Sequence, residues 1–286
     1  MKTLAMGHEQ CAIDRVNASD IFRRFKKETV HEVRQADVTG HSFAERVART
    51  RQMLRSMDPE QALQVIEFHK GLNFFEALVL AQKEGKLIVP NDIHDRILME
   101  TTDKKYLIQN YSVWTGTLII YEKRDKPFGK EVNFSWKDNN DVEYSISFKV
   151  PKQFRGKTNC ALVVEHPDFE LIDRELGDLP KGQTDLGNNN YEIKPLGEIL
   201  LIENFPTETC KWYNPDPETK IPIGEPVKES KEARRLWRLD RAYIGSAGRV
   251  GGAGVFFGDR RCGVSAFDLW SGVSGVALVG CNAAEK

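Results

Sequence analysis

Histidine and cysteine are the residues most able to bind a metal or act as nucleophiles, but their spacing here predicts neither role. The chain has six histidines and five cysteines, no Cys-x-x-Cys pair, and no histidine at a metal-ligand spacing from a second histidine or a cysteine. His94 is close to Asp92 and Asp95 in the sequence, but helical neighbours one or two residues apart do not share a face. We therefore expect His94 to have a surface or capping role, and the thiols to be reduced and mostly buried.

Other catalytic patterns are missing from the sequence as well. Glycines cluster at Gly248, Gly251, Gly252 and Gly254, but no lysine with a following serine or threonine completes a phosphate-binding loop. No Gly-x-Ser-x-Gly, His-Glu-x-x-His or EF-hand pattern occurs. We predict no catalytic residue, no metal site and no cofactor. The charges of Asp259-Arg260-Arg261 are expected to hold the C-terminal tail to the body through bidentate pairs.

The overall charge excludes some classes of partner. The chain of 286 residues has 41 basic and 42 acidic residues and a net charge of −1, so no global field attracts nucleic acid or an anionic membrane. No apolar run approaches the roughly 20 residues of a membrane span, and the first residues lack the apolar region of a secretory signal. We predict no nucleic-acid partner and no membrane span. Cytoplasm is the default location, surface display is an open alternative, and the oligomeric state stays open.

The most unusual stretch is the tail, residues 241–284. It holds ten of the 22 glycines and contains no lysine, glutamate, glutamine or methionine, although these residues are common upstream. Large apolar residues such as Phe256, Phe257 and Phe267 occur in it without a clean helical or strand period. Glycine-rich chain bends readily, and a loop of aromatic and small residues is typical of a binding surface. We expect the rest of the chain to hold this tail in place.

The first 100 residues carry helix signals. Ser19 can cap a helix over 20–35, and Ser42 can cap another over 43–56. Asp58-Pro59-Glu60-Gln61 combines a cap, a proline at the first helical position and a capping-box glutamine, and predicts a helix that runs to Gly71. Further helices are expected from Asn73 to Gly85 and, capped by Asn91, over 92–101. We interpret the arginines and lysines of the first two helices as a solvated face.

From Lys104 onward the pattern changes to strands. Residues 106–122 are rich in aromatic and β-branched residues, and 131–150 reads as a hairpin that turns at 138–141. Residues 160–167 and 191–206 are further strand candidates, separated by a polar loop over 173–190. The four prolines in 212–230 predict a long irregular connection, and 231–239 is either a helical turn or a strand. Helices followed by mainly antiparallel strands indicate an α+β fold.

Two stretches together resemble a known family. The first is the helix, loop and helix over Phe74–Thr101, with GKLIVPNDIHDRILMET at its end. The second comprises Arg249-Val250-Gly251-Gly252, Gly258-Asp259-Arg260-Arg261-Cys262, Ala266 and Ala277-Leu278-Val279-Gly280. Their order is similar to that of C-type lectin folds of the formylglycine-generating-enzyme type. The resemblance implies a C-type-lectin-like domain with antiparallel strands and two helices over 71–286, preceded by a helical N-terminal segment over 1–70.

Within that fold class the tail resembles the variable region of a diversity-generating retroelement protein. In that family an error-prone reverse transcriptase randomises adenines in asparagine codons. The resulting codons cannot encode lysine, glutamate, glutamine, methionine or tryptophan. The tail lacks the first four, and Trp270 would be a fixed position. The resemblance implies a binding protein with a variable region at about 241–284.

Departures from related patterns argue against two activities. Cys262 and Cys281 do not stand in the Ser-x-Cys-Arg-like setting that copper-dependent formylglycine formation needs. Glu225-Pro226-Val227 is not the Glu-Pro-Asn triplet of calcium-dependent sugar binding. We therefore expect neither activity.

The leading hypothesis is display of diversified side chains toward an unknown protein or cell-surface ligand, with the three phenylalanines of the tail supplying most of the contact energy. The predicted ligand-binding positions are Ala253, Val255, Phe256, Phe257, Gly263, Ser265, Phe267, Leu269, Gly272, Val273, Ser274 and Val276. Arg249, Asp259, Arg260, Trp270 and Ala277–Gly280 are expected to be scaffold. An enzyme on the same fold is an alternative, as is a structural or phage-appendage subunit with 1–70 as an oligomerisation arm.

Overall fold

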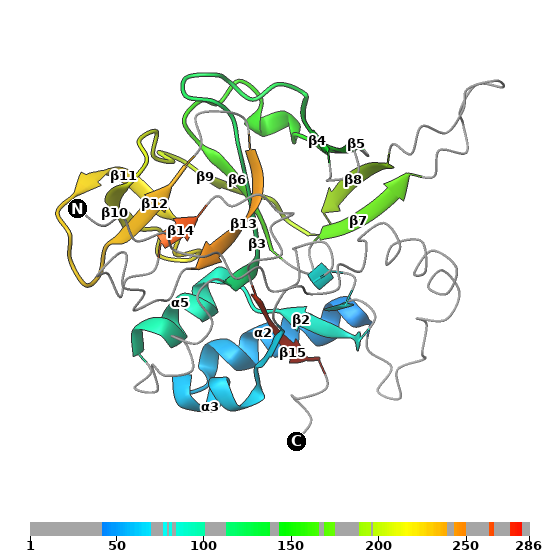
Figure 1. The fold of residues 1–286 in the computed structure, drawn as a ribbon, viewed down its shortest axis with the longest axis vertical. Coiled ribbons are helices and arrows are strands. Elements are labelled where there is room, and N and C mark those ends of the chain that lie inside the picture. Colours follow the sequence, from blue (N-terminus) through cyan, green and yellow to red (C-terminus); the bar gives the residue numbers. More distant parts are fainter. Residues whose placement is uncertain are drawn as a thin grey trace, which may run out of the picture. The chain divides into compact units, whose positions relative to one another are not determined.

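The computed structural model describes most of the chain after residue 41. The described residues are 42–69, 77–78, 80–81, 84–100, 113–137, 143–165, 169–174, 189–195, 197–238, 243–249, 263–265 and 275–281. The chain divides into two compact units, Met1–Gly40 and His41–Lys286. Every described residue, drawn as coloured ribbon in Figure 1, belongs to the second unit. The helix predicted over 20–35 therefore lies outside the described residues.

Helices α2 (Phe43–Ser56), α3 (Pro59–Val65) and α5 (Asn91–Glu100) begin at or next to the predicted residues. At α2 the Ser42 hydroxyl accepts from the backbone N–H of Glu45, while the Glu45 carboxylate accepts from the N–H of Ser42, which completes a capping box. Asp58 caps α3 as predicted. Residues described between 77 and 84 are helical, and Gly85 follows them with φ +61°, the left-handed conformation expected of a helix-ending glycine.

The predicted end of α3 was wrong. The helix stops at Val65 rather than Gly71, and the next residues form strand β1 (Glu67–His69). This strand pairs with β15 (Gly275–Gly280), with Phe68 opposite Ala277. The local signal fixed only the start of the helix, because pairing with a strand some 200 residues away in the sequence overrides helix propensity.

Two sheets make up the β region, so the predicted α+β class is confirmed. An 11-stranded sheet has the main order β1-β15-β3-β13-β14-β12-β10-β11, with β2 paired to β15 and with β6 and β9 extending from β3. Its remaining strands are β2 (Lys86–Ile88), β3 (Val113–Tyr121), β6 (Ala161–Glu165), β9 (Leu200–Ile202), β10 (Lys211–Pro215), β11 (Pro222–Val227), β12 (Arg234–Trp237), β13 (Tyr243–Arg249) and β14 (Gly263–Ser265). A four-stranded sheet has the order β4-β5-β8-β7. Its strands are β4 (Glu131–Lys137), β5 (Glu143–Lys149), β7 (Phe169–Arg174) and β8 (Asn189–Pro195).

Pairing within the sheets is mainly antiparallel, as predicted; the parallel pairs among the described strands are β12–β14, β3–β15 and β5–β8. The predicted hairpin is confirmed as β4–β5, with Val132 opposite Phe148 and Phe134 opposite Ile146. Its turn lies outside the described residues. A single-turn helix, η1 (Lys152–Phe154), follows β5.

The predicted irregular connection over 212–230 was wrong, because it contains the hairpin β10–β11. Asp216 makes the turn: its carboxylate accepts from the backbone N–H groups of Glu218 and Thr219 and from the Thr219 hydroxyl. The prolines are tolerated because β11, which begins at Pro222, ends the described path of the sheet. An edge strand leaves N–H positions unpaired, so a missing N–H costs little there.

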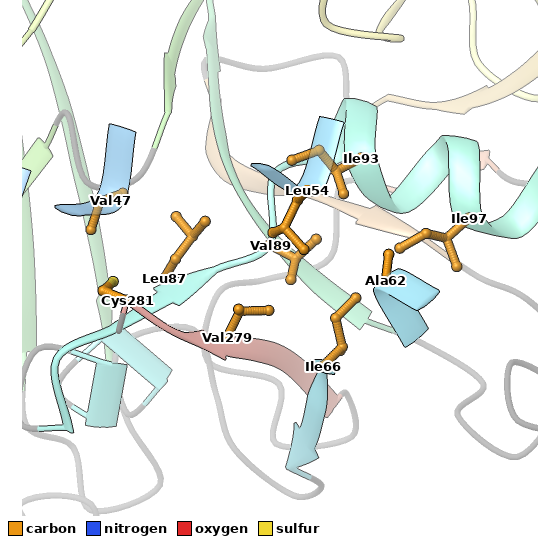
Figure 2. Packing of buried hydrophobic residues seen from close by; sticks show 10 residues of the cluster. All are labelled: Val47, Leu54, Ala62, Ile66, Leu87, Val89, Ile93, Ile97, Val279 and Cys281. Atoms are coloured by element: carbon orange, nitrogen blue, oxygen red, sulfur yellow. The ribbon is translucent and has the colours of Figure 1, made fainter. Parts of the chain in front are cut away.

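A hydrophobic cluster joins the N-terminal helices to the C-terminal strand (Figure 2). Its buried members are Val47, Leu54, Ala62, Ile66, Leu87, Val89, Ile93, Ile97, Val279 and Cys281. Arg96 of α5 also donates to the carbonyl of Leu54 (2.5 Å) and to that of Arg55, at the last turn of α2. Helices α2 and α3, placed in the N-terminal segment by the sequence, thus share one core with β15.

Candidate ligand-binding surface

The tail contributes three strands to the middle of the large sheet. β13 pairs antiparallel with β3 and with β14, β14 pairs parallel with β12, and β15 pairs parallel with β3 (Figure 1). Every strand from the tail therefore has a neighbour from the body of the unit. Such pairing fixes the backbone at each point where the tail enters or leaves the sheet.

One row of paired residues crosses six strands at this place. From β12 to β1 it runs through Trp237, Ser265, Gly248, Trp114, Val276 and His69. Three members, Ser265, Gly248 and Val276, come from the three tail strands. The tail strands are thus aligned with one another through β3, although they are far from β3 in sequence.

The strands also fix the ends of two tail segments. Residues 250–262 join Arg249 to Gly263, and Arg249 is the direct partner of Val264 in β14, so the two ends of this segment are neighbours. Residues 266–274 join Ser265 to Gly275 of β15, with β13 and β3 between them. Three strand spacings separate those ends, about 14 Å.

The predicted ligand-binding positions fall into two groups. Gly263 and Ser265 lie in β14, and Val276 lies in β15, where its backbone partners are Trp114 and His69. The other nine positions lie outside the described residues; they are Ala253, Val255, Phe256, Phe257, Phe267, Leu269, Gly272, Val273 and Ser274. Asp259, Arg260 and Trp270 lie outside them as well. The nine positions belong to the two segments whose ends the strands hold.

The predicted scaffold at the end of the tail is buried. Leu278 and Val279 of β15 have no exposed surface, and neither does Trp114 of β3. Leu278 pairs with Glu67 of β1 and with Ile88 of β2, so those two strands flank β15. This part of the tail is a core element of the fold.

A charged contact joins the two strands that flank β15. The ammonium group of Lys86 lies 2.7 Å from a carboxylate oxygen of Glu67 and 2.7 Å from one of Glu84. Burial by itself would lower the pKa of Lys86, but the hydrogen bonds to the two carboxylates outweigh it and raise that pKa. The same hydrogen bond lowers the pKa of Glu67. Strands β1 and β2, which each pair with β15, are therefore also joined to one another by charge.

Arg238, just after β12, holds the opposite end of β3. Its guanidinium lies 4.7 Å from the ring centroid of Tyr121 and 5.5 Å from that of Phe205. It donates to the carbonyl of Pro206 at 2.6 Å and to that of Glu122 at 2.7 Å. Because Tyr121 pairs with Tyr243, this contact fixes the place where the tail enters the sheet. The single arginine gave no sequence signal for this role.

Burial corrects two expectations in part. His94 is 1 % exposed, so the expected surface role is wrong, and its ring lies 6.4 Å from that of Phe68. Arg49 and Arg55 of α2 are exposed as expected, whereas the side chain of Arg51 is 14 % exposed and lies 3.2 Å from Glu165 of β6. Among the described cysteines, Cys160 and Cys281 are buried as expected, whereas Cys210 is exposed.

Sequence reasoning also missed a cavity of about 390 Å³ lined by charged side chains. These are Arg51, Arg55, Asp92, Glu165, Glu198 and Glu218. They come from α2, α5, β6, the start of β9 and the β10–β11 turn, so no local spacing could have grouped them. Within the described residues, no group of three or more histidine, cysteine, aspartate and glutamate side chains is placed to hold a metal ion.

Comparisons with protein-family models, with curated proteins and with solved structures found no match. No helix in the described part of the chain is long and apolar enough to cross a membrane.

Proposed function

We propose that this protein binds ligands through a diversified C-terminal surface held by a C-type-lectin-like fold, as the variable protein of a diversity-generating retroelement. The ligand would be a protein or a cell-surface molecule. The observation that carries the proposal is the row of paired residues across β14, β13, β3 and β15. It gives two segments rich in small and aromatic residues fixed ends on a rigid sheet, and a rigid base favours precise binding.

Composition supports the same proposal. The missing lysine, glutamate, glutamine and methionine in 241–284 are residues that randomised asparagine codons cannot encode. Buried strand positions such as Leu278 and Val279 lie near the end of the same stretch, so it also contains positions that the fold fixes. Aromatic side chains such as Phe256 and Phe257 provide large contact areas at low entropic cost.

The proposal predicts that the tail tolerates change at the display positions and not at the scaffold. We would randomise the nine predicted positions within 253–274 that lie between strands, using codons of the asparagine-derived set. Most members should keep the cooperative thermal unfolding of the parent chain, and selection against one immobilised probe protein such as lysozyme should enrich binders. Alanine at Phe256, Phe257 and Phe267 should lower binding of the parent chain to any probe that it captures.

The matched control randomises Ala277–Gly280 of β15 with the same codons. Because Leu278 and Val279 are fully buried, most control members should lose cooperative unfolding. Equal loss of folding in both libraries would contradict the display proposal. So would failure to enrich binders above a library randomised at exposed β4 positions such as Glu131, Asn133 and Ser135.

A genomic observation tests the diversification part separately. A near-identical copy of the tail-coding DNA, differing only at adenines and lying beside a reverse transcriptase gene, is the expected result. Differences spread over all four bases would contradict diversification, while leaving the binding experiment unaffected.

A further inference from the structure

None of the described residues that line the charged cavity of about 390 Å³ belongs to the tail. Its apolar lining residues are Val163 of β6, which is fully buried, and Leu200 of β9, which is half-buried. Thr219 of the β10–β11 turn adds a hydroxyl group. The volume lies within the range of small-molecule sites in proteins, about 300–1,000 Å³.

The two guanidinium groups that line the cavity are already paired. Arg51 Nη1 lies 3.2 Å from Glu165 Oε2, and Arg55 Nη2 lies 3.5 Å from the same oxygen. Arg55 Nε donates to Asp92 Oδ2 at 2.7 Å. The carboxylates are largely buried, with 9 % of the Glu165 side chain and 11 % of the Asp92 side chain exposed. The charges of these two guanidinium groups and two carboxylates therefore balance.

The electrostatics of Arg55 disfavour an anionic ligand. Burial alone would lower the pKa of its guanidinium, but the hydrogen bond to Asp92 and the charges of Asp92, Glu165 and Glu218 raise that pKa above its usual value. An anion would have to displace a buried carboxylate from a guanidinium, and the displaced charge would be left without a partner. The Arg55 side chain is 46 % exposed, but the two carboxylates are mostly buried, so leaving a carboxylate without its partner is unfavourable.

The cavity lining contains more carboxylates than guanidinium groups. Four carboxylates and two guanidinium groups line it, so two negative charges remain. Glu198 and Glu218 are exposed, and neither side chain makes a hydrogen bond or an ion pair within the described part of the chain. Asp92 Oδ1 is buried and accepts no hydrogen bond there either. The carboxylates of Glu198 and Glu218 are thus available to an incoming donor.

We propose that this cavity binds an organic cation, with an ammonium or guanidinium group on Glu198 and Glu218 and its carbon chain against Leu200. Charge-assisted hydrogen bonds to the carboxylates supply the polar contacts, and the half-buried Leu200 side chain covers the methylene groups next to the charge. A metal ion fits less well, because no three acidic side chains of the described residues are placed to coordinate one. The proposal does not depend on the function of the tail.

A neighbouring cavity of about 470 Å³ adds room beside the first. It shares Arg55, Asp92 and Glu218 with the first and continues toward Pro217 and Lys220. Five basic and five acidic side chains balance among its described lining residues, so the second cavity adds space rather than net negative charge. A ligand longer than a short monoamine can therefore extend into it.

Calorimetric titration of the full-length chain at low salt tests the proposal with butylammonium, spermidine, N-acetylarginine amide and magnesium chloride as probes. At least one organic cation should bind saturably at one site per chain. The variant E198Q/E218Q should weaken that binding by about tenfold or more, since each charge-assisted hydrogen bond contributes more than about 1 kcal/mol. The control E131Q/E225Q removes the same charge from exposed positions outside both cavities and should change the affinity less than about twofold.

Three results would overturn the proposal: no saturable binding of any organic probe, equal loss in the two double variants, or magnesium binding with the same dependence on Glu198 and Glu218. Tight binding of spermidine would identify a free polyamine as the favoured source of the cation. Preference for N-acetylarginine amide would identify a basic side chain of a peptide. Either preference supports the site, and thermal unfolding of each variant checks that the fold is intact.

Discussion

The ion pair between Asp95 and Arg234 joins α5 to β12 where the protein excludes water. Arg234 Nε lies 2.7 Å from Asp95 Oδ1, and Nη2 lies 2.8 Å from Oδ2. The side chains are only 6 % and 4 % exposed, for Arg234 and Asp95 respectively. A buried guanidinium that loses its carboxylate keeps a charge without compensation. This buried pair with two hydrogen bonds therefore matters more for stability than an exposed ion pair does.

Replacement of Asp95 by alanine should lower the free energy of unfolding by about 3–5 kcal/mol. Urea denaturation of the variant and the parent chain measures the change. The control is Glu203→Ala, which breaks the exposed pair of Lys157 and Glu203 and should cost less than about 1 kcal/mol. A smaller effect of Asp95→Ala than of Glu203→Ala would contradict the assignment of a buried pair.

The buried thiols predict how stability changes at high pH. Burial raises the pKa of Cys160 and that of Cys281 from 9.0 to about 11. Folding therefore favours the protonated thiols, and the stability that they contribute is complete below pH 9 and lost as the pH rises through about 11. The raised pKa of Lys86 acts in the same direction.

We expect the free energy of unfolding to fall between about pH 9 and pH 11, with a smaller fall in the variant Cys160→Ala/Cys281→Ala. Denaturation curves at several pH values measure this fall in the free energy of unfolding.

In a pulse of iodoacetamide at pH 8, peptide mapping should find Cys210 labelled well before Cys160 and Cys281, because only the first of these is exposed. Equal labelling of the three would contradict their burial.

At the scale of single elements, the sequence predicted the helices and strands whose signals act over a few neighbouring residues. The Ser42 cap, the Asp58-Pro59 start and the alternation in β4–β5 each act over a few residues, so the structure agrees with them. Strand β1 and hairpin β10–β11 depend on partners or turns that override propensity, so they were missed. The sequence predicted the tail as a site by its composition, but the three tail strands depend on pairing with β3 and β12. The charged cavity depends on five separate elements and has no local signal.

The packing of α2 against β15 gives an element-scale prediction. Leu54 has no exposed surface and belongs to the cluster that contains Val279 and Leu87 (Figure 2). Leu54→Ala should lower the free energy of unfolding by about 2–5 kcal/mol, since it leaves a cavity in a packed interior. Gln52→Ala on the exposed face of the same helix should change it by less than about 0.5 kcal/mol. Chemical denaturation compares the two, and similar losses would mean that Leu54 is not a core residue.

At the scale of the whole molecule, the position of the unit boundary decides which part of the chain can hold the tail. The sequence placed the boundary after residue 70, whereas the compact unit that contains the sheet begins at His41. Between these positions lie α2, α3 and β1. They supply four buried members of the core cluster, namely Val47, Leu54, Ala62 and Ile66, and one of the strands that flank β15.

A chain of residues 41–286 should therefore fold, and a chain of residues 71–286 should not. Loss of several buried apolar side chains, each contributing about 1.5–3 kcal/mol, removes an amount comparable with the total stability of a domain, about 5–15 kcal/mol. Strand β15 would also lose its partner β1, so the tail would lose part of its anchor. Thermal unfolding followed by circular dichroism should show a cooperative transition for 41–286 and none for 71–286. A cooperative transition in 71–286 would instead place α2 and α3 in a separate N-terminal segment, and the display surface would then need only the strands that follow it.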